Sequence, residues 1–182
     1  MRVRRKHIQN LVNQILLTNE IQSAPVDIER IAANLNIQIV EQNIEDEVAG
    51  FLLKGYDNKN ALIGINTHHH PNRQRFTVAH ELGHYFLHDY EGVHFDGKTT
   101  GLRMYLRNEK SATGTDLEER EANLFAAELL MPENLLREDL ADVEEIYLID
   151  DDDLTIKDLA KQYQVSVRAL TYRLGNLGYI EL

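Results

Sequence analysis

The residues best suited to chemistry are His80-Glu-Leu-Gly-His84, an H-E-x-x-H pattern within an apolar, helical segment. Positions i and i+4 share one face of a helix, about 6 Å apart along its axis, so both imidazoles can reach one metal ion. Glu81 lies beside them, where its carboxylate can take a proton from a water on that ion. Zinc lowers the pKa of such a water to about 7. The pattern therefore predicts a zinc centre with Glu81 as the general base.

Two histidines leave a catalytic zinc site incomplete, because such sites normally have three protein ligands. His88 would lie about 12 Å along the same helix from His80, too far to share one ion. We therefore interpret His88 as a histidine that supports a ligand or lies at the surface. The longer H-E-x-x-H-x-x-G-x-x-H pattern is absent, since Leu87 and Tyr90 occupy its Gly and last His positions.

The better source of a third ligand is a second helix, expected at about residues 116–131. Glu119 could bind the metal there, and Asn123 one turn later could hold a ligand histidine by its other ring nitrogen. Glu121 is the alternative ligand. These acidic residues could instead form a capping box or a solvated helix face. We favour Glu119 over Glu121.

The elements that must position these residues can be read from hydrophobic periodicity. Apolar residues recur with a helical period near the N-terminus, and β-branched runs bounded by polar turns predict strands. Pro71 suits the first position of the helix that carries the motif. The expected elements are helices at 3–20, 28–35, 71–90 and 116–131, strands at 37–40, 48–54 and 61–65, a hairpin turn at 55–60, and a β-containing excursion at 91–116.

The C-terminal residues 154–182 predict a compact helical tail that resembles a helix-turn-helix. Ser166 would cap its second helix, and Gln164 occupies the turn position where glycine is common. Four basic and two acidic residues give the tail a charge of only +2. That charge is weak for DNA binding, so we expect the tail to dock on the rest of the protein or to bind a helical protein partner, in preference to DNA.

Composition excludes several classes of protein. The 182-residue chain has no cysteine, which removes disulfide frameworks, thiolate zinc sites and cysteine nucleophiles. Its net charge of −11 argues against a protein that coats nucleic acid. Residues 133–153 hold ten of the thirty acidic residues and one arginine, which indicates an exposed linker. The basic N-terminus is followed by an amphipathic helix, so we expect a soluble, unexported protein without a membrane span.

Two segments together resemble the ImmA/IrrE family of zinc metallopeptidases. They are Arg73-Gln-Arg-Phe-Thr-Val-Ala-His-Glu-Leu-Gly-His-Tyr-Phe-Leu-His88 and Glu119-Arg-Glu-Ala-Asn-Leu-Phe-Ala-Ala-Glu-Leu-Leu-Met-Pro132. The strands expected around Ala49–Leu53 and Leu62–Asn66 fit the family as well. The likeness covers about residues 5–135, and the two motifs in combination are far more specific than either one.

The resemblance implies an α+β fold, in which a small antiparallel or mixed sheet packs on the H-E-x-x-H helix of a minimal zincin-like domain. This domain would span residues 1–135, followed by an acidic linker at 136–153 and the helix-turn-helix-like tail at 154–182. The family's pattern implies one zinc per chain, held by His80, His84 and Glu119, with Glu81 as base.

The resemblance also implies a cytoplasmic endopeptidase whose protein substrate is a helix-turn-helix transcriptional repressor, in an anti-repressor role. Zincins bind extended peptides beside an edge strand, for which we expect residues 61–66 or 48–53. Donors to the oxyanion could be Tyr85, His88, Tyr90 or His94. Two other functions remain open: a regulatory binding protein with little turnover, and a DNA-binding regulator that uses the tail.

Two further features have simpler interpretations. Gly83, between the motif histidines, would let another backbone approach the helix closely. The run His68-His69-His70 precedes Pro71 in an expected loop, so a solvated turn is preferred to a second metal site.

Overall fold

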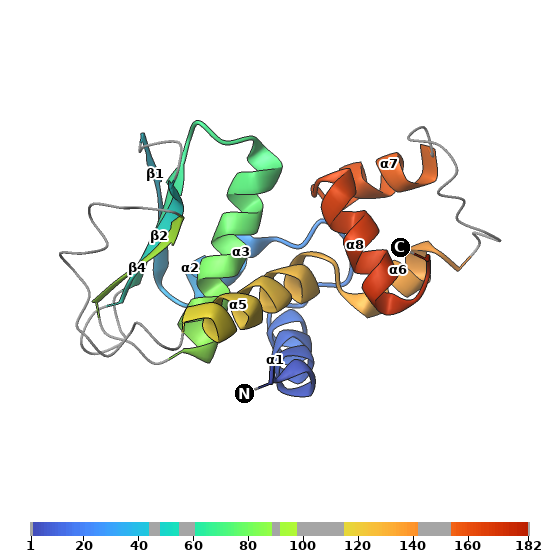
Figure 1. Ribbon diagram of the computed structural model, residues 1–182, viewed down its shortest axis with the longest axis horizontal. Helices are drawn as coiled ribbons and strands as arrows, with labels where there is room; N and C mark the ends of the chain where they lie inside the picture. The colour runs from blue at the N-terminus through green and yellow to red at the C-terminus, as the bar shows by residue number, and fades with distance from the viewer. Residues whose placement is uncertain are drawn as a thin grey trace.

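The computed structural model describes residues 2–43, 48–54, 61–88, 92–97, 115–141 and 154–181, which form an α+β fold (Figure 1). In chain order the elements are α1 (Arg5–Thr18), α2 (Ile28–Asn34), β1 (Ile37–Gln42), β2 (Val48–Lys54), β3 (Ala61–Asn66), α3 (Pro71–Leu87), β4 (Gly92–Gly97), α5 (Thr115–Leu130), α6 (Glu133–Asp139), α7 (Leu154–Gln162) and α8 (Val167–Leu177). The helices and strands expected from periodicity are confirmed. The expected turn at 55–60, parts of the 91–116 excursion and the last two residues of the helix expected at 71–90 lie outside the described residues.

The sheet is mixed, with the strand order β1-β3-β2-β4. Strands β1 and β3 are parallel, whereas β2 is antiparallel to both β3 and β4. This order corrects the expectation that residues 61–66 or 48–53 form an edge strand. Both lie inside the sheet, because β1 pairs with the far side of β3 and β4 with the far side of β2. Among the described residues, the outer strands are β1 and β4.

Helix α3 carries the H-E-x-x-H motif and begins as predicted at Pro71, where the His70 ring accepts a hydrogen bond from the Asn72 backbone N–H. It ends at Leu87, three residues before the expected end at Tyr90. His88 has extended backbone angles, with φ −125° and ψ 130°. The buried Lys54 of β2 donates hydrogen bonds to the carbonyls of Tyr85 and His88, at 3.0 and 3.1 Å. A cation at these carbonyls complements the negative end of the helix dipole and ends the helix there.

Helices α3 and α5 cross with their backbones in close contact at Gly83, as the sequence predicted. A Cβ atom at Gly83 would lie 3.0 Å from the Cα of Ala122, 3.1 Å from its carbonyl oxygen and 3.2 Å from the Cβ of Phe125. Ala122 and Phe125 are fully buried. Glycine is favoured at this crossing because even a Cβ atom would push against the backbone of α5.

Helix α1 is amphipathic and buries Ile8, Val12, Ile15 and Leu16 in the main core. Helix α2 begins at Ile28 and is capped by Asp27, whose side chain accepts a hydrogen bond from the Arg30 backbone N–H. None of the helices in the described part of the chain is both long and apolar enough to cross a lipid bilayer.

The tail docks on the rest of the protein, in agreement with the preferred interpretation of its sequence. Its buried apolar residues belong to the same hydrophobic core as those of α1, α3 and α5. Ser166 caps α8 by accepting a hydrogen bond from the Ala169 backbone N–H, and Gln164 adopts a positive φ of 53° in the turn. The Tyr163 hydroxyl donates a 2.7 Å hydrogen bond to Asp139 of α6.

Part of the segment expected as a linker is helical. Residues 136–139 form the end of α6, where Leu136 is fully buried, and Leu140 after the helix is also buried. Residues 142–153 lie outside the described residues. The division of the chain into three regions stays a prediction.

The tail is anchored by a buried ion pair between Arg173 of α8 and Glu128 of α5, with contacts of 2.6 and 2.9 Å. Arg173→Met would leave the Glu128 carboxylate buried without its cation. We expect a loss of about 3–5 kcal/mol in the free energy of unfolding, measured by urea denaturation. Arg173→Met/Glu128→Met should recover much of it. The exposed Arg168→Met on the same helix is the control, and a loss at Arg173 as small as the control's would contradict this anchoring role.

The Gly83→Ala variant tests the close crossing of α3 and α5. Overpacking typically costs about 1–3 kcal/mol, whereas alanine gains up to about 1 kcal/mol over glycine in a helix. We therefore expect a net loss of about 1–2 kcal/mol in the free energy of unfolding. The same change at the half-buried Gly175 of α8 should be neutral or stabilising, so equal effects at the two glycines would argue against a steric constraint at Gly83.

Candidate metal centre

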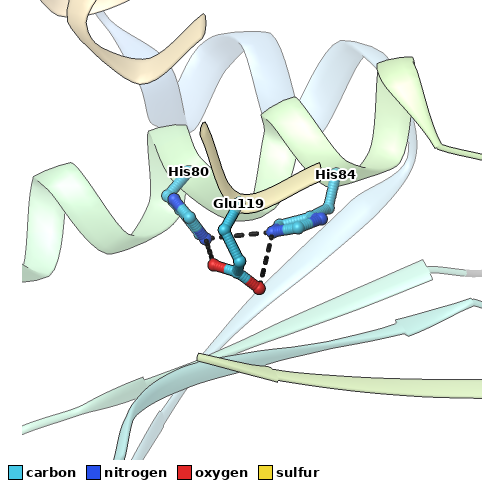
Figure 2. A group of neighbouring side chains, drawn as sticks. All are labelled: His80, His84 and Glu119. Carbon is cyan, nitrogen blue, oxygen red and sulfur yellow. Dashed lines mark hydrogen bonds and ion pairs between the residues drawn. The ribbon is translucent and has the colours of Figure 1, made fainter. Parts of the chain in front are cut away.

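Three potential ligand groups converge between α3 and α5 (Figure 2). The Nε2 atoms of His80 and His84 lie 3.0 Å apart. The Glu119 carboxylate faces both rings, with Oε2 at 3.3 Å from His80 Nε2 and Oε1 at 3.7 Å from His84 Nε2. Both histidines are buried, whereas the Glu119 side chain is 30% exposed and opens the group to solvent. The structure thus brings together the three residues that the sequence predicted as ligands.

This group fits a tetrahedral metal ion in both its spacing and its chemistry. Ligand atoms about 2.0–2.1 Å from a tetrahedral ion lie about 3.3 Å from one another. The observed separations of 3.0, 3.3 and 3.7 Å bracket that value. Two imidazoles and one carboxylate are a ligand set that zinc accepts, with one position left for water or substrate. The three residues could therefore hold one metal ion.

Glu81 is fully buried on α3, directly after His80. A carboxylate is rarely placed at such a position unless it has a specific role, because its charged form loses its hydration there. Glu81 is not one of the three residues of the ligand group, so its carboxylate is not assigned as a ligand.

The two histidines are each held at the ring nitrogen that faces away from the ligand group. Asn123 Oδ1 lies 3.1 Å from His80 Nδ1, as the sequence predicted. His88 Nδ1 lies 3.1 Å from His84 Nδ1, so His88 supports a ligand and is not at the surface. Such contacts fix the tautomer and the orientation of a metal-binding imidazole.

A chain of polar contacts extends from His88 to the N-terminus of the protein. His88 Nε2 lies 3.4 Å from Glu121, and Glu121 accepts three hydrogen bonds from the Arg4 side chain and one from its backbone N–H. Arg4 also donates to the carbonyl of Leu87, the last residue of α3. Sequence reasoning missed Arg4, because it lies 117 residues from Glu121 and belongs to no motif.

Glu121 is paired with Arg4 and His88 and does not face the ligand group. The hydrogen bonds from the Arg4 side chain lower the pKa of Glu121 to about 2, so its carboxylate is ionised and held by Arg4. Burial lowers the pKa of His88, which favours its neutral form. A neutral His88 can accept a hydrogen bond from His84 Nδ1–H and donate its Nε2–H to Glu121. The alternative in which Glu121 is the third ligand is therefore not favoured by the geometry.

The other residues singled out in the sequence have more ordinary surroundings. Both ring nitrogens of His88 are engaged, and Tyr85 lies under Lys54 Nζ, 5.0 Å from the ring centre. Tyr90 and the side chain of His94 lie outside the described residues, so the donor to the oxyanion stays a prediction. His68 and His70 are exposed in the turn before α3, whereas His69 is half-buried, so the solvated-turn interpretation is confirmed for two of the three histidines.

Comparisons with known proteins agree with this geometry. The model of the peptidase M78 family, described as the IrrE N-terminal-like domain, matches residues 32–175. A protein of Bacillus phage phi105, named uncharacterized immunity region protein 2, is 33% identical over 103 residues, which are 57% of each chain. A solved structure titled Mycobacterium tuberculosis transcriptional regulator has the same fold, with a TM-score of 0.61 and 16% identity. The match covers 93% of this chain but only 46% of that one, so this chain spans about half the length of both proteins.

Proposed function

Since the chain belongs to the peptidase M78 family of IrrE N-terminal-like domains, we propose that it is a zinc-dependent endopeptidase acting on a regulatory protein. The observation that carries this proposal is the convergence of His80 and His84 of α3 with Glu119 of α5, whose ligand atoms lie within 4.8 Å of one another, next to the buried Glu81 of α3. A protein that only bound its partner would need neither this ligand group nor a buried carboxylate beside it.

His80, His84 and Glu119 would hold the zinc. When bound, zinc supplies a Lewis acid that polarises the scissile carbonyl and makes a water acidic. Glu81 accepts the proton of the attacking water and delivers it to the leaving nitrogen, the role of the glutamate in H-E-x-x-H helices. Asn123 and His88 orient the two imidazoles. Each residue has one task in this assignment; α3 and α5 supply all of them except His88, which directly follows α3.

The polypeptide substrate would lie along β4 in an extended conformation. Strand β4 is an outer strand of the described sheet, and its Gly92 is paired with Lys54 of β2. Lys54 in turn holds the end of α3, so this edge begins beside the helix that carries the motif. Addition of a strand at an open edge fixes the backbone of a peptide by main-chain hydrogen bonds.

We further propose that the substrate is a helix-turn-helix transcriptional repressor and that the reaction takes place in the cytoplasm. The family resemblance carries this proposal, and the similarity to a phage protein named for an immunity region supports it. Cleavage of a repressor would relieve repression. The lack of cysteine suits a reducing compartment.

Removal of the third ligand tests the metal centre. Glu119→Ala removes a ligand, so it should weaken zinc binding by more than about 100-fold. Loss of a residue that only supports a ligand usually weakens metal binding by about 10- to 100-fold. Glu121→Ala is the matched control two residues away, for which we expect about 10-fold or less. Competition with a fluorescent chelator measures both affinities, and wild-type protein should hold one zinc per chain. A larger effect at Glu121 would assign the ligand to that residue instead.

Glu81→Gln tests the general base with an almost isosteric change. We expect zinc content to be retained and cleavage to fall by about 100- to 10,000-fold, the usual contribution of a positioned base. A helix-turn-helix repressor encoded by a neighbouring gene would serve as the test substrate, and mass spectrometry of the products would measure cleavage. The exposed Glu133→Gln is the control. Undiminished cleavage by Glu81→Gln would remove Glu81 from this role, and a zinc-loaded wild type that binds the repressor without cutting it would favour a binding protein.

A further inference from the structure

A groove of about 680 Å³ lies between the tail and the helices of the metal centre. It is lined by residues of α1, the first half of α3, α5 and α8, which face one another in this part of the fold (Figure 1). We call it the tail groove. Its apolar lining includes Phe76, Leu124, Ala127 and Leu177, and Tyr172 stands at its rim with 52% of its surface exposed.

The tail groove lies behind the metal centre and not within it. Asn123 lines the groove and contacts Nδ1 of His80, whereas Nε2 of the same ring faces His84 and Glu119. Phe76 lines the groove as well, and its ring centre lies 6.3 Å from that of His80. A molecule in the groove would therefore be separated from the reacting atoms by one layer of side chains.

The charge of the tail groove is opposite to that of the whole chain. Its lining includes the exposed Arg5, Arg73 and Arg168, in a chain whose net charge is −11. The lining has one acidic residue, Glu128, whose carboxylate is already paired with Arg173. Within the described ranges, no carboxylate forms an ion pair with these three exposed arginines. They can therefore attract an anionic partner.

The shape of this surface suits an extended partner. A second hollow of about 720 Å³ adjoins the tail groove and shares four lining residues with it, including Asn72 and Val165. Lys157 and Lys161 of α7 add two further cations there. Each hollow alone has the size of a small-molecule site, so the two in succession favour a longer ligand with an apolar face and acidic flanks.

We propose that the tail groove is an exosite for an acidic amphipathic helix of the protein that the enzyme cleaves. This inference rests on the proposed function in so far as the bound protein is the substrate. Leucine-like residues at helical spacing fill the apolar floor, and glutamates or aspartates on either side pair with Arg73 and Arg168. Attraction between the acidic segment and the arginines speeds encounter and selects the partner.

A fluorescein-labelled amphipathic peptide of about 18 residues, with leucines at i, i+3, i+4 and i+7 and glutamates elsewhere, is a direct probe. Fluorescence anisotropy with the Glu81→Gln protein measures its binding without cleavage. We expect Arg73→Glu/Arg168→Glu to weaken binding of the probe by at least about 10-fold, because the double variant loses two charge-assisted contacts with the glutamates of the probe. Arg30→Glu/Arg137→Glu makes the same change in net charge at exposed positions outside the groove and should alter binding less than about two-fold.

Three outcomes would overturn the exosite. They are equal binding of a probe with lysine in place of glutamate, equal loss in the two double variants, and tighter binding of duplex DNA that depends on Arg73 and Arg168. Each of these outcomes can be told apart from a failure of the metallopeptidase proposal. That proposal is tested by zinc content and by the effect of Glu81→Gln on cleavage, and neither measurement involves these arginines. Probe binding should also persist in metal-free protein.

Discussion

The contact between α3 and α5 at Gly83 is the constraint on which the metal centre depends. The His80 and His84 rings project from α3, and Glu119 can reach both only if α5 crosses at short range. Ala122, one turn after Glu119, lies against Gly83 at distances that leave no room for a side chain. The 3.3 and 3.7 Å separations between Glu119 and the two histidines thus depend on a backbone contact in the core. A more widely spaced pair of helices would keep the motif and lose the site.

Helix α5 distributes its polar side chains among different partners. Glu119 faces the two motif histidines, Asn123 holds His80, Glu121 binds Arg4 and His88, and Glu128 binds Arg173 of the tail. The buried carboxylates of Glu121 and Glu128 are each satisfied by an arginine, as such groups must be in a low-dielectric interior. The first residues of the chain and the last helix are therefore tied to the same helix that completes the metal centre. This arrangement makes the tail part of the folded unit.

Residue spacing predicts features that lie within one helix, such as the pair of motif histidines. It does not predict features that depend on tertiary contacts, such as the choice of the third ligand, the end of α3 and the edge strands. The two histidines of H-E-x-x-H share one face of any helix that carries them, so the sequence alone is enough to identify His80 and His84. The choice between Glu119 and Glu121 depended on the rotation of α5, because residues two apart on a helix point to nearly opposite sides. The early end of α3 required Lys54 from a strand, and the identity of the edge strands required the sheet order. No local pattern connects these residues.

Acidic and basic residues lie in different parts of the chain. Most of the net negative charge comes from residues 133–153, which hold ten acidic residues and one arginine, whereas exposed arginines gather at the tail groove, next to Asn123 and Phe76 behind His80. A chain with a net charge of −11 repels nucleic acid and other acidic polymers in general. A positive groove with an apolar floor overcomes that repulsion only for a ligand that also has an apolar face in the right register. Acidity over the rest of the chain thus increases the selectivity of the groove, since an acidic partner without that face gains too little to remain bound.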